Sequence, residues 1–122
     1  GYREIWLFGL LGGRLDQTLA NVLLLTHPAL ANTAVTLFTP TERAWLVRQQ
    51  TTISGQVGDV VSLIPLRGDV QMVATTGLQW PLVNETLQFG QARGISNRMT
   101  AVSATVEISS GILLCVHTVV GG

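Results

Sequence analysis

A strand, a glycine turn and a helix are predicted to meet at Gly12-Gly13-Arg14-Leu15-Asp16-Gln17-Thr18-Leu19-Ala20-Asn21. The run before it, Glu4-Ile5-Trp6-Leu7-Phe8, has the apolar and aromatic residues typical of a strand. Paired glycines allow backbone conformations and close approaches that a side chain would forbid. The apolar residues that follow can share one helical face: Leu19, Val22, Leu23 and Leu25.

Asp16 in this stretch has two interpretations. Near a helix start, its carboxylate can simply accept backbone N–H groups, as Asp often does in that place. Asp16 and Arg14 also follow the carboxyl end of a predicted strand, which is where open α/β sheets bind their ligands. The local sequence leaves both interpretations open.

Length and composition restrict the possible classes of protein. The chain has 122 residues, 47% of them apolar, which is enough for one modest domain or part of a larger one. Seven basic and seven acidic residues give a formal charge of zero, so nucleic acid is not an expected partner. The apolar runs are too short to span a bilayer and no signal peptide begins the chain, so we expect a cytoplasmic protein without a membrane partner. Cys115 lies in an apolar run and is expected to be a buried thiol.

The first third of the chain has the pattern of an α/β domain. A second strand is predicted at 34–39, and alternating strands and helices are typical of a parallel sheet covered by helices. Two strands and one helix do not complete such a layer, so we expect the end of an α/β domain whose earlier part is missing. Pro40-Thr41-Glu42-Arg43 interrupts the pattern, and the predicted domains are therefore residues 1–42 and 43–122.

The remainder is rich in strands and turns. Strands are expected at 45–52, 57–64, 70–74, 102–108 and 112–118, the last one apolar on both faces. Leu66-Arg67-Gly68-Asp69 is interpreted as a hairpin turn. The predicted fold is thus mainly β: an antiparallel β-sandwich preceded by a truncated strand-helix-strand segment of an α/β nucleotide-binding domain.

Two polar or glycine-bounded segments interrupt this β pattern. Thr75-Thr76-Gly77-Leu78-Gln79-Trp80-Pro81-Leu82 places an aromatic residue between glycine and proline, where it either packs under a loop or contacts a ligand. Gly90-Gln91-Ala92-Arg93-Gly94-Ile95-Ser96-Asn97 either closes a turn or carries binding groups. Arg43 is expected to be solvated, His117 to be structural, and Arg98 to lie near the second segment.

Four stretches, taken together, resemble the carboxyl-terminal part of thiamine pyrophosphokinase. They are the 12–21 stretch, Ser62-Leu63-Ile64-Pro65-Leu66, Gly77-Leu78-Gln79-Trp80-Pro81-Leu82 and Ile95-Ser96-Asn97. The resemblance implies an enzyme that transfers pyrophosphate from ATP to the hydroxyethyl oxygen of thiamine, giving thiamine diphosphate and AMP. It also implies a homodimer with thiamine bound at the interface between subunits.

The resemblance assigns roles to particular residues. Trp80 would stack on the thiamine rings, and Ser96 and Asn97 would bond the aminopyrimidine edge. Gly77 and Gln17 would also belong to the substrate site, although Gln17 stands where members of the family often carry His.

The catalytic roles would fall on the glycine turn. Asp16 would face the reacting hydroxyl or its Mg²⁺, and Arg14 would either reach phosphate oxygens or pair with a local acid. Family members carry an acidic cluster for Mg²⁺ and ATP upstream of the turn, and nothing in this sequence corresponds to it. The expectation is therefore a truncated enzyme, inactive alone, that supplies thiamine binding and dimerisation. The alternative is a noncatalytic β-sandwich module for dimerisation or interaction.

Overall fold

The computed structural model of the chain describes residues 3–8, 15–30 and 33–120. In chain order the elements are β1 (Arg3–Phe8), α1 (Leu15–Leu24), the 3₁₀ turn η1 (Pro28–Leu30), β2 (Thr33–Phe38), β3 (Glu42–Val47), β4 (Gln50–Ser54), β5 (Val60–Pro65), β6 (Val70–Thr76), β7 (Thr86–Leu87), β8 (Asn97–Arg98), β9 (Ser103–Ser110) and β10 (Leu113–Thr118). Within these residues, no helix has the length and the apolar character needed to cross a membrane.

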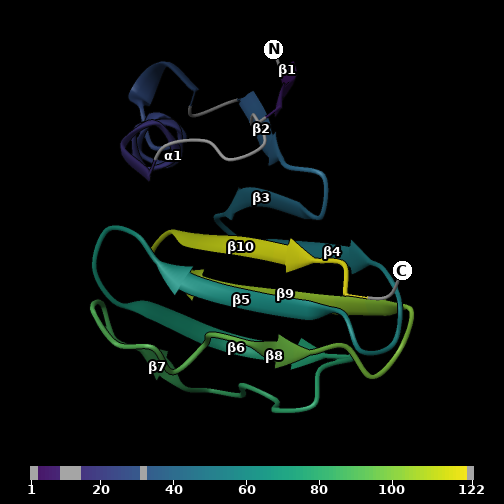
Figure 1. Ribbon diagram of the computed structural model, residues 1–122. Coiled ribbons are helices and arrows are strands. Elements are labelled where there is room, and N and C mark those ends of the chain that lie inside the picture. The colour runs from purple at the N-terminus through teal and green to yellow at the C-terminus, as the bar shows by residue number, and fades with distance from the viewer. Residues whose placement is uncertain (1–2, 9–14, 31–32, 121–122) are drawn as a thin grey trace.

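The strands form two sheets. A six-stranded sheet has the order β1-β2-β3-β10-β5-β8, and a four-stranded sheet has the order β4-β9-β6-β7. β1 and β2 pair in parallel, while the other ladders between these strands are antiparallel. In the lower part of Figure 1 the four-stranded sheet faces the β10-β5-β8 part of the six-stranded sheet, whose other end, with β1 and β2, lies above together with α1. The predicted β-sandwich and the strand-helix-strand segment before it are both confirmed.

The core between the sheets explains the patterns of β9 and β10. In β9, Ala104, Val106 and Ile108 are buried and their neighbours are exposed, as expected for a strand with one face in a core. In β10, Leu113 and Cys115 belong to the core between the sheets, whereas Leu114 and Val116 belong to a second cluster near α1. β10 is apolar on both faces because each face packs in a different cluster.

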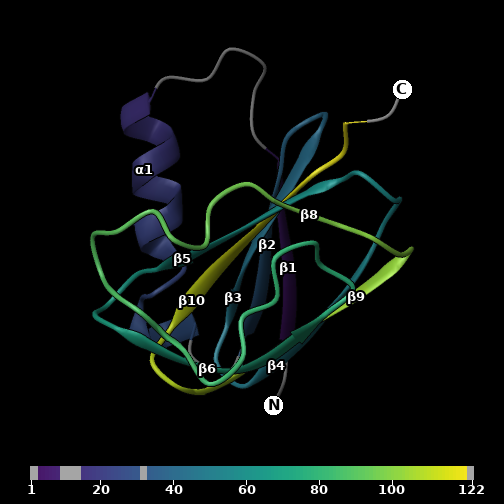
Figure 2. The same cartoon turned by 90° about the horizontal axis from the view of Figure 1, so that it is seen from below.

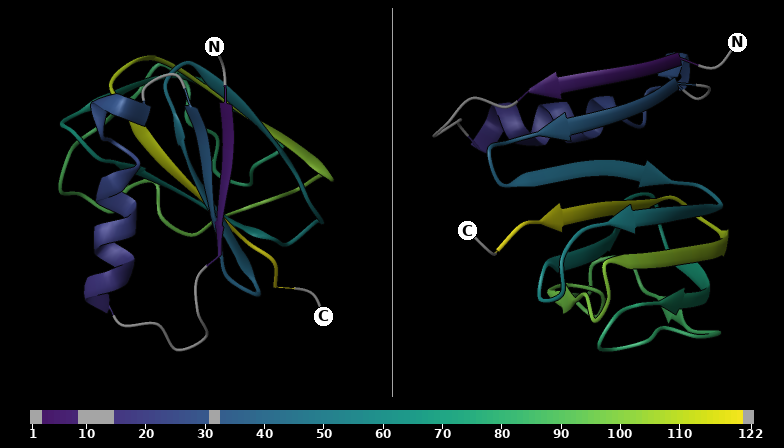
Figure 3. Two further views of the ribbon diagram at one scale, coloured as in Figure 1. Left: turned by 90° about the horizontal axis from the view of Figure 1, so that it is seen from above. Right: turned by 90° about the vertical axis from the view of Figure 1, so that its right-hand side faces the viewer.

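α1 packs against the six-stranded sheet through only part of its predicted apolar face. Leu25, just after the helix, packs with Val35 and Leu114, and Val22 lies against the same cluster. Leu19 and Leu23, which belong to the same predicted apolar face, are exposed to solvent. Figures 2 and 3 show the helix beside one face of the β1–β2 end of the sheet.

The predicted hairpin at residues 66–69 is wrong. β5 belongs to the six-stranded sheet and β6 to the four-stranded sheet, so this connection crosses between sheets and pairs no neighbouring strands. The glycine does take a turn conformation, with φ of +108° at Gly68. The predicted strand at 45–52 is likewise divided, because β3 ends at Val47 and β4 begins at Gln50 in the other sheet.

The six-stranded sheet continues across the predicted domain boundary. β2 and β3 pair as an antiparallel hairpin in which Phe38 lies opposite Arg43 and Thr36 opposite Trp45. The N–H of Thr39 donates to the carbonyl of Glu42 at 3.0 Å and closes the turn. Residue 42 is thus the first residue of a strand inside one continuous sheet.

Candidate ligand-binding site

Two loops at the β8 end of the sandwich enclose a pocket of about 340 Å³. Its lining residues come from the two segments that interrupted the β pattern: Trp80, Leu82, Arg93, Ile95, Ser96 and Asn97. The structure therefore brings together three of the residues that the sequence selected, Trp80, Ser96 and Asn97.

Trp80 is presented by a loop that is anchored on both sides. Leu78 and Leu82 are 6% and 1% exposed and insert into the core, whereas Trp80 is 51% exposed. Buried Thr75 accepts the N–H of Leu82 through its hydroxyl at 3.0 Å. Gly77 opens the loop with φ of +72°, in the left-handed region that favours glycine. Trp80 is thus half exposed, contrary to the interpretation that it packs under a loop.

Ser96 and Asn97 point in opposite ways along one short segment. Ser96 has φ of +62°, which is uncommon for a residue with a side chain, and its N–H donates to Oγ of Ser62 at 3.0 Å. Ser96 is exposed, whereas Asn97 is 4% exposed and bonds through its amide to the backbone of Trp80. The segment closes a turn, as one interpretation proposed, and it also leaves Ser96 exposed at the pocket.

One arginine lines the pocket, and its charge is paired. Nη2 of Arg93 lies 2.8 Å and 3.2 Å from the two carboxylate oxygens of Glu85. Arg98 does not line the pocket: its Nη1 donates to the carbonyl of Gly58 at 3.1 Å. The pocket therefore presents an aromatic face and a hydroxyl beside a neutralised ion pair.

Asp16 and Gln17 lie elsewhere, in the first turn of α1. Both are exposed. Oδ1 of Asp16 accepts the N–H of Gln17 at 2.8 Å, and Nε2 of Gln17 donates to Oδ1 of Asn21 at 3.1 Å. The backbone bond is the one that the helix-start interpretation of Asp16 predicts, and an acidic group also suits the positive end of the helix dipole. Arg14 lies outside the described residues.

The magnesium site implied by the resemblance has few candidate ligands among the residues that the structure describes. Mg²⁺ prefers near-octahedral oxygen ligands, usually carboxylates together with substrate phosphates. In the part of the chain that the structure describes, no three His, Cys, Asp or Glu side chains come together as a metal site. Asp16 alone does not make a Mg²⁺ site.

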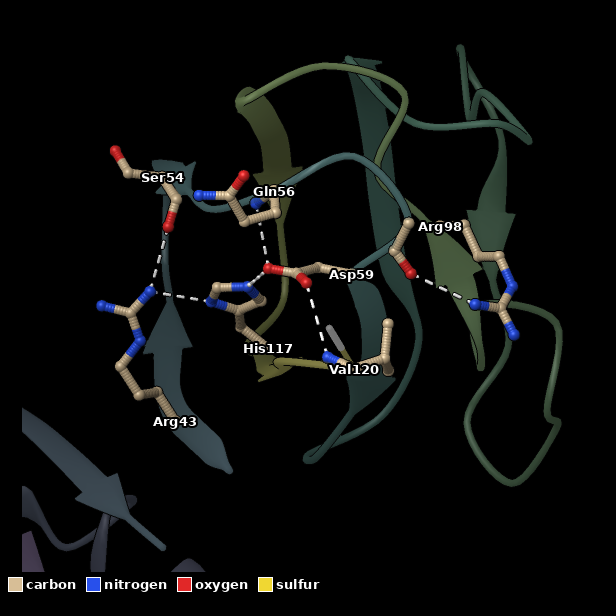
Figure 4. A network of polar contacts seen from close by, with 8 residues as sticks. Arg43, Ser54, Gln56, Asp59, Arg98, His117 and Val120 are labelled. Atoms are coloured by element: carbon tan, nitrogen blue, oxygen red, sulfur yellow. Dashed lines mark hydrogen bonds and ion pairs between the residues drawn. The ribbon is translucent and has the colours of Figure 1, made fainter. Parts of the chain in front are cut away.

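The sequence did not reveal a buried polar network that links β3, β10 and the residue before β5 (Figure 4). Nε2 of His117 lies 2.8 Å from Oδ2 of Asp59, and Nη2 of Arg43 lies 2.8 Å from Nδ1 of His117. Arg43 also donates to the carbonyl of Ser54 at 3.1 Å, so it is a half-buried member of the network and not a solvated boundary residue. The structural role predicted for His117 agrees with its 1% exposure.

Asp59 is ionised within this network. Burial alone would raise the pKa of Asp59, but hydrogen bonds from His117 and from the backbone N–H groups of Gln56 and Val120 outweigh it and hold the pKa below its usual value. The loop that carries Asp59 is also tied to the end of β8, because the N–H of Met99 donates to the carbonyl of Asp59 at 2.8 Å. In the sequence, the network is marked only by Asp59 and His117, each of which is an ionisable residue in an otherwise apolar run.

The fold defines a class: a domain of two β-sheets with a strand-helix-strand extension and a surface pocket beside β8. The model of one family, described as the thiamin pyrophosphokinase vitamin B1 binding domain, matches residues 49–113. The chain belongs to this family. The matched segment contains Trp80, Ser96, Asn97 and Gly77, and it excludes α1 with Asp16.

Particular relatives agree with this membership. The chain is 26% identical over 116 residues to the thiamine pyrophosphokinase of Bacillus subtilis, covering 93% of this chain and 54% of the relative. The crystal structure of thiamine pyrophosphokinase from Bacillus subtilis superposes with a TM-score of 0.86 at 26% identity, over 97% of this chain and 57% of that one. The enzyme from Geobacillus thermodenitrificans gives a TM-score of 0.79 at 28% identity, over 98% and 55% of the two chains. The chain spans about half the length of the relatives that it matches.

Proposed function

We propose that this chain binds thiamine at the Trp80 pocket as part of a thiamine pyrophosphokinase, which transfers pyrophosphate from ATP to the hydroxyethyl group of thiamine. Residues 43–122 would supply thiamine binding and dimerisation, and residues 1–42 would belong to the catalytic side. Family membership and the similarity to the two bacterial enzymes support the proposal.

The observation that carries the proposal is the half-exposed indole of Trp80 on the pocket wall. Thiamine consists of a cationic thiazolium ring and a neutral aminopyrimidine ring joined by a methylene group, and an indole face attracts such a cation by roughly 0.5 to 2 kcal/mol while stacking on a flat ring. Arg93 would repel a cation if it were unpaired, but Glu85 offsets its charge. The Ser96 hydroxyl can both donate and accept, which suits an aminopyrimidine edge.

Catalysis would require groups from the other end of the six-stranded sheet. Asp16 lies in α1, which follows edge strand β1, whereas Trp80 lies beside the opposite edge strand, β8. α1 packs on one face of this sheet and lies well away from β8 in Figure 1. This separation supports a homodimer in which Asp16 of one copy serves thiamine held by Trp80 of the other.

In that homodimer, the residues of this chain would bind and orient thiamine and handle its hydroxyl proton. Trp80 and Ser96 would bind and orient thiamine, and Asp16 would orient its hydroxyl or accept the proton. The nucleotide and Mg²⁺ would be held mainly by parts of the enzyme outside these residues, and the ion would neutralise phosphate charge.

The test is a calorimetric titration of thiamine into three proteins: the parent chain, the Trp80→Ala variant and the Phe89→Ala variant. The oligomeric state of each is measured by sedimentation. Phe89 is a matched control because it is an exposed aromatic, 58% accessible, that does not line the pocket. Removing the stacking face should weaken binding roughly 3- to 30-fold, and Phe89→Ala should bind like the parent. Equal binding by Trp80→Ala would overturn the stacking role. A folded dimer without thiamine binding would favour the noncatalytic interaction module.

A further inference from the structure

The side-chain amide of Asn97 is bonded to both peptide groups of Trp80. The N–H of Trp80 donates to Oδ1 of Asn97 at 3.0 Å, and Nδ2 of Asn97 donates to the carbonyl of Trp80 at 2.7 Å. Oδ1 also accepts the N–H of Arg98 at 2.9 Å. A carboxamide oxygen has two lone pairs, so the acceptor capacity of Asn97 is fully used within the protein.

This pair of bonds extends a backbone ladder. The N–H of Gln79 donates to the carbonyl of Arg98, and the N–H of Thr100 donates to the carbonyl of Gly77, both at 2.8 Å. Leu78 and Met99 form an antiparallel bridge between them. The ladder has no backbone partner for Trp80, and the amide of Asn97 takes that place.

The conformation of Ser96 makes the arrangement possible. Its φ of +62° turns the chain so that Asn97 points inward and is 4% exposed, while Ser96 remains on the exposed side of the pocket. A residue with a side chain takes a positive φ only at a cost, which surrounding contacts must offset. The bonds of Asn97 to Trp80 are contacts of this kind.

We propose that Asn97 is a positioning residue that fixes Trp80 at the pocket wall and acts on the ligand through Trp80, in place of the direct bond to the aminopyrimidine that the resemblance implied. The proposal rests on thiamine binding at Trp80. It assigns direct polar recognition on this segment to Ser96 and orientation of the aromatic face to Asn97.

The first experiment examines Trp80 without ligand. The chain is labelled with 5-fluorotryptophan, its three tryptophan signals are recorded by ¹⁹F NMR, and Trp80 is assigned with Trp80→Phe. Asn97→Leu, which is similar in size, and Asn97→Asp, which loses the donor to the Trp80 carbonyl, should each shift and broaden the Trp80 signal alone. Gln79→Ala is the matched control: it removes an exposed amide next to Trp80 and should leave that signal unchanged.

The second experiment is a double-mutant cycle on thiamine affinity. Asn97→Leu and Trp80→Ala should each weaken binding roughly 3- to 30-fold, and the double variant should bind no more weakly than Trp80→Ala. Asn97→Asp should also bind more weakly than the parent, although its carboxylate would attract a cation. If Asn97→Leu does not fold, Asn97→Asp takes its place in the cycle.

The two experiments together test whether Asn97 acts on the ligand through Trp80. Additive losses in the cycle, or weaker binding with an unchanged Trp80 signal, would mean that Asn97 contacts the ligand directly and would overturn the proposal. A disturbed Trp80 signal with unchanged affinity would overturn it as well. If the parent chain binds no thiamine, the proposed function fails, and the ¹⁹F spectra alone decide whether Asn97 orders Trp80.

Discussion

Nε2 of His117 lies 2.8 Å from Oδ2 of Asp59, and both side chains are 1% exposed. The guanidinium of Arg43 can only donate, so Nδ1 of His117 accepts from it, and the N–H at Nε2 donates a hydrogen bond to Oδ2 of Asp59. Two of these residues are on neighbouring strands, β3 and β10, and Asp59 directly precedes β5 on the other side of β10. The three side chains therefore tie together the middle of the six-stranded sheet.

Asp59→Ala should destabilise the fold strongly. The substitution leaves the buried N–H of His117 without its acceptor and also removes the acceptor of the partly buried N–H of Gln56; an unpaired buried group costs about 2 to 4 kcal/mol. The free energy of unfolding from urea titration measures the effect.

Glu107→Ala is the control for Asp59→Ala. Glu107 is an exposed carboxylate on β9, and its removal should change stability by no more than about 0.5 kcal/mol. Equal effects of the two substitutions would contradict a structural role for the network.

Ionisation of Asp59 should make the stability of the fold depend on pH. Its pKa in the folded state is lowered, so the carboxylate stabilises the fold fully above the unfolded value of about 4. That contribution is lost as the pH falls through the folded pKa, because the unfolded chain takes up its proton first. The stability difference between the parent and Asp59→Asn should therefore shrink from pH 5 to pH 3, as measured by urea midpoints. A difference that grows on acidification would show that the sign is wrong.

Local patterns predicted strands but not the sheet that each strand joins. The alternation in residues 102–108 and the apolar character of 112–118 both predicted correct strands, because each reports which faces are buried. The turn at residues 66–69 was predicted to be a hairpin from its glycine and aspartate. Turn residues predict that the chain changes direction. Whether the flanking strands then pair with each other or join different sheets depends on how their side chains pack.

The sequence predicted residues of the pocket but not the buried network or the direction of Asn97. The resemblance selected Trp80, Ser96 and Asn97, which line one pocket although Trp80 and Asn97 are 17 positions apart. The buried network was not predicted because its partners are 58 and 74 positions apart, and no local pattern marks such pairs. The inward direction of Asn97 depends on the φ of Ser96, which composition does not reveal.

Cys115 should be unreactive in the folded chain. It is fully buried, and burial raises the pKa of its thiol to about 12 despite the nearby charge of Arg43. Because the thiolate is the reactive form, a thiol reagent such as DTNB at pH 8 should react at least about 100-fold more slowly with the native chain than with the chain in urea. Labelling of the native chain at the rate of a free thiol would contradict this burial.

Gly77→Ala should cost more stability than Gly90→Ala, although both glycines have positive φ, +72° and +87°. A Cβ at Gly77 would collide with the carbonyl of Ser103 and lie 3.0 Å from Cα of Ala104, whereas nothing lies within 4 Å of one at Gly90. The left-handed backbone costs about 1 to 2 kcal/mol for alanine at either position, and the collision should raise the total at Gly77 to about 2 to 4 kcal/mol. Since Gly77 begins the loop that carries Trp80, its substitution should also weaken thiamine binding, and that of Gly90 should not. Equal losses of stability in urea titrations would mean that backbone conformation alone, and not the close approach to β9, requires glycine at position 77.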